Sequence, residues 1–173
     1  FWMLTTALKP APEVLVYPPR LIPSAWHFET FAEAWGAAPF NRFLFNSVLV
    51  TGLSIVAQMF SSAIVAYGFA RFRFRGRDVL FAVVLATMMI PWDVTMIPQY
   101  MLFNKLDWIN TLKPLIVPNF FGAPFFIFLL RQFFLTLPFE LEEAATIDGA
   151  NPLQIFLRII LPLSVPALIV VGV

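Results

Sequence analysis

The chain has 173 residues, of which 60% are hydrophobic and 12% charged, with a mean hydropathy of +0.83 and a formal net charge of +1. These values lie far from the averages for soluble domains, so a lipid bilayer is the expected solvent. The near-neutral charge and the dispersed basic residues argue against a nucleic-acid partner, and with no cysteine and one histidine we expect no disulfide, metal site or cofactor.

Both ends of the sequence resemble parts of membrane spans. Residues 1–8 are interpreted as the end of an earlier helix, because the Lys9-Pro10 pair discourages its continuation. Residues 163–173 could rise only roughly 16 Å as a helix, about half of the ~30 Å hydrocarbon thickness, so they are interpreted as the start of another span. We therefore expect an internal fragment of a longer membrane protein.

The segment from Lys9 to Arg42 is rich in proline and aromatic residues. Within it, Thr30 and Glu33 have the spacing of a capping box, which predicts a short helix over 31–35. Its aromatic side chains would lie at headgroup depth at the membrane surface.

Three complete spans are predicted, at 43–70, 79–101 and 115–137. The first has no charged residue, the second contains Asp93, and the third has Arg131 near one end. A spanning segment must satisfy its backbone hydrogen bonds internally, and runs this long without alternation do not form a closed strand barrel. The expected fold class is therefore an all-α, polytopic bundle of transmembrane helices forming a single domain.

Four arginines lie within eight residues between the first two spans, in the sequence RFRFRGRD at 71–78. The positive-inside bias predicts that this loop is cytoplasmic. Alternation then puts 9–42 and 103–113 outside and 138–162 inside. A polybasic patch for lipid or nucleic acid is the alternative interpretation.

The predicted inner loop, 138–162, has the signals of two helices joined by a turn. Pro138 ends the third span, and the three acids Glu140, Glu142 and Glu143 fall in the first turns of a new helix, where they complement its dipole. One face of this helix is mostly small and apolar, with residues spaced i, i+3, i+4 and i+7. That face comprises Leu141, Ala144, Ala145 and Asp148.

The turn between the two arms has its own signals. Gly149 suits a left-handed C-terminal position, and Asn151 followed by Pro152 is typical of an N-cap and a first helical residue. We expect a rigid elbow whose second arm, 153–161, leads straight to Pro162 and the next span, which makes it a suitable lever for transmitting displacement into the membrane.

Polar residues inside the spans are candidates for a solute path. Ser47, Thr51, Ser54, Gln58, Ser61 and Ser62 share one face of the first span. This stripe could line a path or serve helix packing. Asp93 lies about 21 Å along the second span from Val79, so it faces either a wet cavity or the outer interface. Pro91 and Pro98 flank it and can free backbone carbonyls. The candidate path residues are Asp93, Gln99, Asn119, Gln58 and Ser54.

The order Glu143-Ala144-Ala145, Asp148-Gly149-Ala150, Pro152 and Leu161-Pro162 closely resembles the EAA loop of ABC importer permeases. The arginine loop, IPWDVTMIPQYMLF at 90–103 and GAPFFIFLLRQFFLTLP at 122–138 also match that family. The chain is most similar to its carbohydrate-uptake branch, to which the second permease subunits of maltose and glycerol-phosphate importers belong.

The resemblance implies a type I ABC importer fold in a prokaryotic cytoplasmic (inner) membrane. It implies four kinds of neighbour: ATPase subunits, a second permease subunit, an extracytoplasmic solute-binding protein that meets the outer face, and the lipid bilayer. Coupling to the ATPase would be carried by Glu142, Glu143, Ala144, Ala145, Asp148, Gly149, Asn151 and Pro152. The sequence has no GxxxxGK[ST] motif, so we expect a transport subunit with no catalytic residues, and ATP hydrolysis in a partner.

Two alternatives remain at this level. The permease could serve another small solute, such as an amino acid or a peptide. The chain could instead be a non-ABC structural or secondary-transport membrane protein whose loop only resembles the elbow, in which case it would function without any ATPase.

Overall fold

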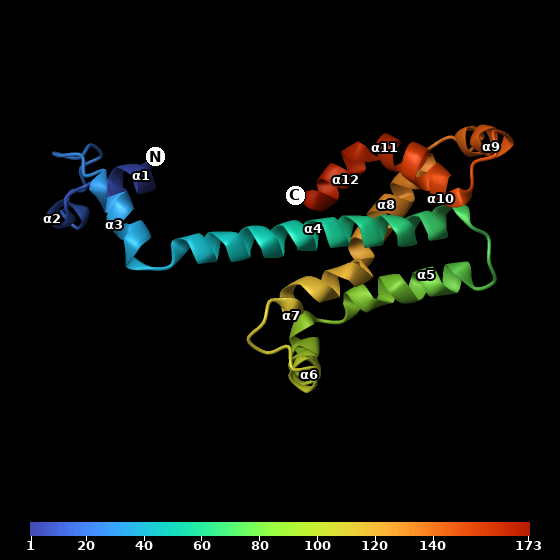
Figure 1. The fold of residues 1–173 in the computed structure, drawn as a ribbon, viewed down its shortest axis with the longest axis horizontal. Coiled ribbons are helices and arrows are strands. Elements are labelled where there is room, and N and C mark those ends of the chain that lie inside the picture. Colours follow the sequence, from blue (N-terminus) through green and yellow to red (C-terminus); the bar gives the residue numbers. More distant parts are fainter. The chain divides into compact units, whose positions relative to one another are not determined.

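The computed structural model describes residues 1–173 and divides them into two compact units, Phe1–Val48 and Leu49–Val173 (Figure 1). All regular elements are helices, so the expected all-α class is confirmed. Two helical segments are long and apolar enough to cross a membrane: the helix Phe40–Arg71, and the run of consecutive helices over Lys113–Thr136. Two further helix pairs meet the same test when each bent pair is counted as one span.

The first unit contains three short helices, α1 (Trp2–Ala7), α2 (Ala11–Val14) and α3 (Glu29–Ala37). Lys9 is buried here, and its Nζ donates to the carbonyl oxygen of Arg20 at 2.5 Å. The same ammonium group lies 4.5 Å from the centre of the Trp2 ring. A buried lysine is tolerated because both contacts replace water around its charge.

Helix α3 is longer than the predicted 31–35 helix and begins earlier. Its N-cap is Phe28, which makes no side-chain cap hydrogen bond, so the predicted capping box between Thr30 and Glu33 is wrong. Thr30 lies inside the first turn, where its hydroxyl is not at the capping position. Glu29 supplies an acid to that turn and contacts His27 Nδ1 at 2.6 Å, which favours the earlier start.

The second unit is built around most of α4 (Phe40–Arg71). The elements that follow α4 are α5 (Arg77–Ala86), η1 (Thr87–Met89), α6 (Trp92–Lys105), α7 (Lys113–Ile116), η2 (Val117–Phe121), α8 (Pro124–Thr136), α9 (Glu140–Ile147), α10 (Pro152–Ile155), the π-helical η3 (Phe156–Ile160), α11 (Leu161–Leu163) and α12 (Val165–Gly172). Helix α8 contacts both α5 and α12.

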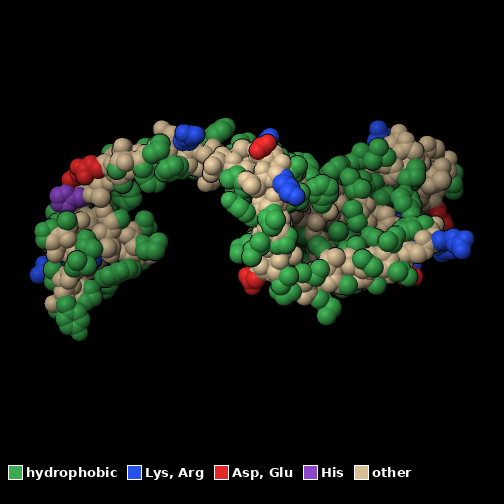
Figure 2. Space-filling model, turned by 90° about the horizontal axis from the view of Figure 1, so that it is seen from below, with side chains coloured by type: hydrophobic (Ala, Val, Ile, Leu, Met, Phe, Trp, Pro, Cys, Tyr) green, Lys and Arg blue, Asp and Glu red, His purple; other side chains and the backbone are tan.

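The core of this unit joins small residues of α4 to large ones of the later helices. Ala63 and Ala66 are fully buried, as are Leu130, Phe134 and Ile160. Small residues on α4 let neighbouring helices approach its backbone closely. In lipid, where the hydrophobic effect does not drive helices together, such close packing is a main source of helix association. Figure 2 shows many hydrophobic side chains spread over the visible face of the second unit, with fewer charged ones among them.

The predicted span 79–101 differs from the structure, because it is not one straight helix. The α5–η1 segment and α6 are bent by 97° at the break between them. Ile90 is extended there, with φ −77° and ψ 115°, and Pro91 is the N-cap of α6. A residue before proline is disfavoured in the α region, and proline has no N–H to continue the ladder.

The predicted lever 153–161 leads to Pro162, and the chain bends before the next helix. After the π-helical turn η3, the chain bends by 77° between Pro152–Leu163 and α12. Pro162 and Pro166 each remove a backbone donor on either side of the bend. Ser164 lies between them, and its Oγ donates to the carbonyl oxygen of Ile160 at 2.6 Å.

Candidate functional site

Helix α9 has the acidic start that was predicted. Its first turn contains Glu140, Glu142 and Glu143, and the amides of the latter two donate to the carbonyl oxygen of Phe139 at 3.0 and 3.1 Å. Acidic side chains at this end complement the positive pole of the helix dipole. The short helix is thereby stabilised at its N-terminus without a side-chain cap.

The turn that ends α9 requires glycine. Gly149 has φ +83°, so the left-handed conformation predicted for it is confirmed. Its amide donates to the carbonyl oxygen of Thr146 at 3.0 Å, and that of Ala150 donates to Ala145 at 2.9 Å. An added Cβ would meet nothing within 4 Å, so backbone conformation, and not crowding, is the reason for glycine.

The start of α10 is fixed by a capping box. Asn151 is the N-cap and Pro152 the first helical residue, as predicted. The Asn151 carboxamide accepts from the amide of Gln154 at 2.9 Å, and the Gln154 side chain accepts from the amide of Asn151 at the same distance. Sequence reasoning missed Gln154, although its position three residues after the N-cap was a sufficient signal.

The predicted coupling residues divide into an exposed and an inward set. Most are exposed: Glu143, Ala144, Asp148, Gly149, Asn151 and Pro152. Ala145 packs against the core, and the Glu142 side chain is only 8% exposed. Ile147 was not predicted and is among the most exposed large apolar residues of the chain, at 86%. The outward surface of the elbow is therefore small, apolar and acidic.

Glu142 faces Arg71, the last residue of α4. The Nε of Arg71 lies 2.5 Å from Oε1 of Glu142, and the two side chains are 7% and 8% exposed. The hydroxyl of Tyr67 donates to the other carboxylate oxygen at 3.3 Å. Arg71 Nη2 donates to the carbonyl oxygen of Leu137 at 2.9 Å, and its guanidinium lies 5.6 Å from the centre of the Phe139 ring. Sequence reasoning had used Arg71 only for orientation, and no local signal pairs it with Glu142.

The elbow and the end of α4 enclose a mostly apolar hollow of about 520 Å³. The rim includes the exposed side chains of Phe72, Phe139 and Ile147, and Pro152 at the start of α10. The charged atoms of Arg71 and Glu142 lie at the buried side of the same hollow. The exposed residues Glu143 and Thr146 also line the hollow, so a partner side chain that enters it would meet apolar surface and one carboxylate.

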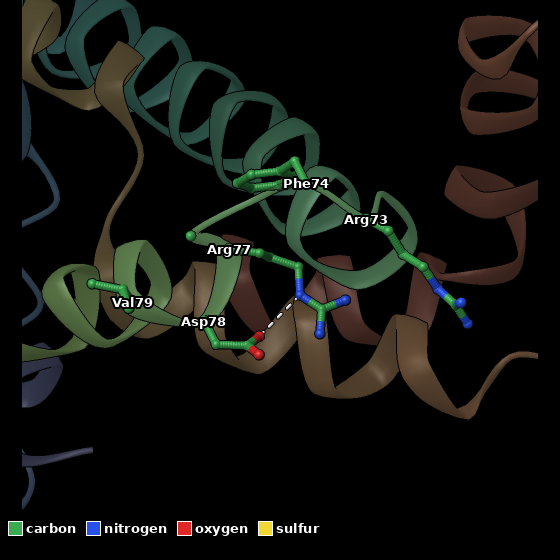
Figure 3. Close-up of a pocket in the computed structure, with 6 residues that line it drawn as sticks. Arg73, Phe74, Arg77, Asp78 and Val79 are labelled. Atoms are coloured by element: carbon green, nitrogen blue, oxygen red, sulfur yellow. Dashed lines mark hydrogen bonds and ion pairs between the residues drawn. The ribbon is translucent and has the colours of Figure 1, made fainter.

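The arginine loop lies at the same end of the second unit as the elbow (Figure 1). Ala70, Arg71, Arg73, Arg77 and Phe139 line one shared hollow, which joins the loop to the start of α9. In Figure 3, the side chains of Arg73 and Arg77 project to the same side of the loop, and Arg77 Nε contacts Asp78 Oδ1 at 2.9 Å.

Three of the predicted path residues come together where α4 meets η2. Asn119 Nδ2 donates to Ser54 Oγ at 3.1 Å and to the carbonyl oxygen of Leu115 at 2.8 Å. Nearby, Gln58 Nε2 donates to Ser62 Oγ at 3.2 Å, and that oxygen also accepts from the amide of Ala123 at 3.3 Å. The polar stripe of α4 thus bonds to the chain around the start of α8.

The other two path candidates lie apart from this network, on α6. Asp93 is exposed in the first turn of that helix, directly after the bend at Pro91. Gln99 is partly buried on the same helix. Neither forms a side-chain hydrogen bond with the α4 stripe, so the structure does not assemble the five candidates into one site.

Comparison with known proteins decides the family. Residues 58–172, which include the elbow and the polar stripe from Gln58 onward, match the family model described as "binding-protein-dependent transport system inner membrane component". The chain belongs to this family. The resemblance to ABC importer permeases inferred from the EAA-like order is confirmed, and the non-ABC alternative is excluded.

Several curated relatives match almost the whole chain. A probable ABC transporter permease of Bacillus subtilis, YurM, is 39% identical over 99% of this chain and 57% of its own length. The diacetylchitobiose uptake permease NgcG of Streptomyces coelicolor is 34% identical over the same shares. The arabinooligosaccharide permease AraQ of B. subtilis is 34% identical over 96% of this chain and 60% of its own length. The chain thus spans about three fifths of the length of these relatives.

A solved structure has a similar fold. A chain of a bacterial ABC transporter involved in the import of the acidic polysaccharide alginate has a TM-score of 0.77 and 27% sequence identity, covering 99% of this chain and 60% of that chain. The expected importer-type transmembrane helix fold is confirmed by this match.

Proposed function

We propose that the chain forms part of the permease subunit of an ATP-driven, binding-protein-dependent importer for a sugar or related polyol. The observation that supports it most is the elbow: α9, the left-handed Gly149 turn and the capped start of α10 form a rigid, exposed corner between long apolar helices. Such a corner can receive a displacement from a partner and pass it into the membrane.

The proposed partner at the elbow is an ATPase subunit. Ala144 offers a small surface, Glu143 and Asp148 offer negative charge, and Ile147 offers an exposed apolar side chain. Small side chains permit close approach, and an acidic rim favours a partner with basic residues. ATP hydrolysis would take place in that partner, because this chain contains no phosphate-binding GxxxxGK[ST] sequence.

The complete assembly would contain a second permease subunit and an extracytoplasmic solute-binding protein, in a prokaryotic cytoplasmic membrane. Closure of the ATPase dimer would move the docked elbows and switch the permease pair between inward- and outward-facing states. The switch would be driven by the different affinities of these two states for nucleotide. The arginine loop, on the same side as the elbow, supports a cytoplasmic location for both.

Sugar is the proposed solute class because relatives named for diacetylchitobiose and arabinooligosaccharides, and a structural neighbour that imports alginate, all handle carbohydrates. An amino acid or a peptide is the remaining alternative. Uptake of labelled oligosaccharides, amino acids and peptides by proteoliposomes with the complete transporter would decide between them. Uptake of amino acids or peptides alone would overturn the sugar assignment.

The first test of the docking proposal is capture of the ATPase by the full-length permease from membranes. The parent protein is compared with a variant carrying Ala144→Arg and Gly149→Val. We expect a co-purifying ATPase subunit with the parent and its loss in the variant, because the changes add bulk to the contact face and a β-branched residue at positive φ. The matched control, Thr136→Val, alters an exposed residue before the elbow. Failure of the parent to capture any ATPase would overturn the proposed function.

A further inference from the structure

Arg71 joins three helices at the base of the elbow. It is the last residue of α4, it donates to the carbonyl oxygen of Leu137 at the end of α8, and it pairs with Glu142 in the first turn of α9. Its guanidinium also lies against the Phe139 ring, at the N-cap of α9. One side chain therefore contacts both sides of the corner where the chain leaves α8 and enters α9.

The pair is held in one arrangement. Its two side chains are almost fully buried, and the second carboxylate oxygen of Glu142 accepts from Tyr67, one turn before Arg71 on α4. A buried charge that loses its partner is strongly destabilising, so these groups separate far less readily than an exposed ion pair. Arginine suits this position because its planar fork reaches several acceptors at once.

We propose that Arg71 is a positioning residue of the coupling elbow, which ties α9 to the end of α4 so that a displacement of the elbow also moves α4. The inference rests on the proposed function and deepens it. The chain itself connects α9 only to α8 and α10, so a displacement of α9 reaches α4 directly only through side-chain contacts. The Arg71–Glu142 ion pair is the charged contact among them, and the Tyr67–Glu142 hydrogen bond supports the same carboxylate.

The movement of α4 would reach residues that form polar contacts with the segment before α8. The same α4 bears Ser54, which bonds to Asn119, and Ser62, which accepts from the amide of Ala123. A shift of α4 relative to this region would therefore change the polar contacts at the break before α8. Arg71 would connect the ATPase-facing corner to the polar face of the first long helix.

The test uses the complete transporter, with its ATPase, second permease and binding protein, in proteoliposomes. Four variants are compared: Arg71→Gln, Arg71→Lys, Glu142→Gln and the charge exchange Arg71→Glu with Glu142→Arg. Arg73→Gln is the matched control, because Arg73 is exposed in the same loop and forms no ion pair. The measurements are solute-stimulated and basal ATPase rates and the amount of ATPase captured.

We expect Arg71→Gln and Glu142→Gln to lower the ratio of stimulated to basal ATPase rate by about 2- to 30-fold, the range for residues that modulate coupling. The captured ATPase should stay unchanged, because the exposed docking surface is intact. Arg71→Lys should keep part of the ratio, since an ammonium restores the charge but not the planar fork. The charge exchange should recover part of it, and Arg73→Gln should match the parent.

An unchanged ratio in Arg71→Gln, with ATPase captured normally, would overturn the inference. If Arg71→Gln is not recovered from membranes, the charge exchange and Arg71→Lys carry the test. The inference is supported if either variant is recovered from membranes in normal amount and its ratio of stimulated to basal ATPase rate lies above that of Glu142→Gln. Recovery of both in normal amount with a ratio as low as an uncoupled transporter overturns it. Absence of ATPase from the parent complex would contradict the proposed function instead.

Discussion

The Nε of Arg131 donates to the carbonyl oxygen of Phe69 at 3.3 Å, and its guanidinium carbon lies 4.3 Å from the centre of the Phe81 ring. Phe69 belongs to the last turn of α4, where carbonyl oxygens have no partner within the helix. Arg131 on α8 therefore caps α4, just as Arg71 on α4 donates to Leu137 at the end of α8. The two helices are joined reciprocally through their C-terminal carbonyls.

We expect Arg131→Met to lower the free energy of unfolding by about 1–3 kcal/mol, the cost of leaving a buried polar group unpaired. Methionine keeps most of the apolar stem, so the change isolates the donor and the cation. Thermal unfolding in detergent would measure it. The control is Arg158→Met, at an exposed arginine with no hydrogen bond or ion pair in the structure. Equal stability of the two variants would refute the capping role.

Gly122 lies against Ser62 and has φ +73°. A Cβ added to Gly122 would be 3.2 Å from Ser62 Oγ and 3.4 Å from its Cα, so the buried Ser62 side chain would have to shift by a few tenths of an ångström. We expect Gly122→Ala to destabilise the protein by about 1–3 kcal/mol, from overpacking and backbone strain together. Gly68→Ala is the matched control, since that helical glycine has open space around it. Its stability should stay the same or rise by up to about 1 kcal/mol.

The capping box of α10 gives a prediction for local stability. Asn151→Ala removes the acceptor for the Gln154 amide, so we expect a loss of about 1 kcal/mol and faster hydrogen exchange at the start of α10. Gln154→Glu should behave like the parent, because glutamate completes the same box. Exchange of the Gln154 amide, followed by mass spectrometry or NMR, measures both. Unaltered exchange in Asn151→Ala would contradict the role of the cap.

The elbow was predictable because its signals are local. A positive-φ glycine, an N-cap asparagine followed by proline, and acids in the first turn each depend on only a few neighbouring residues. The same reasoning overlooked Gln154 and misassigned Thr30. In the second case the spacing of a capping box was present, but the helix had already begun at Glu29. A short motif does not set the start of a helix alone.

The two sharp bends were less accessible from the sequence. Hydropathy alone indicates a continuous apolar segment across Pro91 and across Ser164, and proline is often accommodated by a mild kink in a membrane helix. The bend at Pro91 is 97°. A proline in a membrane helix is tolerated where neighbouring helices satisfy the freed backbone groups, and those neighbours are not evident from the local sequence. The Arg71–Glu142 pair was equally inaccessible, because its partners come from helices far apart in the chain.

The polar residues of the spans separate into two predicted roles. Asn119 bonds to Ser54 and to Leu115, so we expect Asn119→Leu to lower stability by about 0.6–1.7 kcal/mol, as for interhelical hydrogen bonds in membranes. Asp93 is exposed and makes no ion pair, so Asp93→Asn should lower stability by at most about 0.3–1 kcal/mol, the contribution of an acid in the first turn of a helix. If Asp93 faces the solute, the variant loses a charge-assisted hydrogen bond of ~1.5 kcal/mol. The solute concentration that gives half-maximal uptake would then rise about tenfold.

Thermal unfolding and concentration-dependent uptake in proteoliposomes, measured on both variants, separate packing from path lining. Asp107→Asn is the control for removing an exposed acid from the loop that follows α6. If Asn119→Leu is less stable but keeps the parental solute concentration for half-maximal uptake, the α4 stripe serves packing. The stripe then holds helices together without touching the solute. The reverse result, stable protein with weakened uptake, would instead put the path along α4. For Asp93→Asn, uptake identical to the parent would remove this residue from the path, since an acid that touches a polar solute cannot be neutralised without changing how tightly that solute is held.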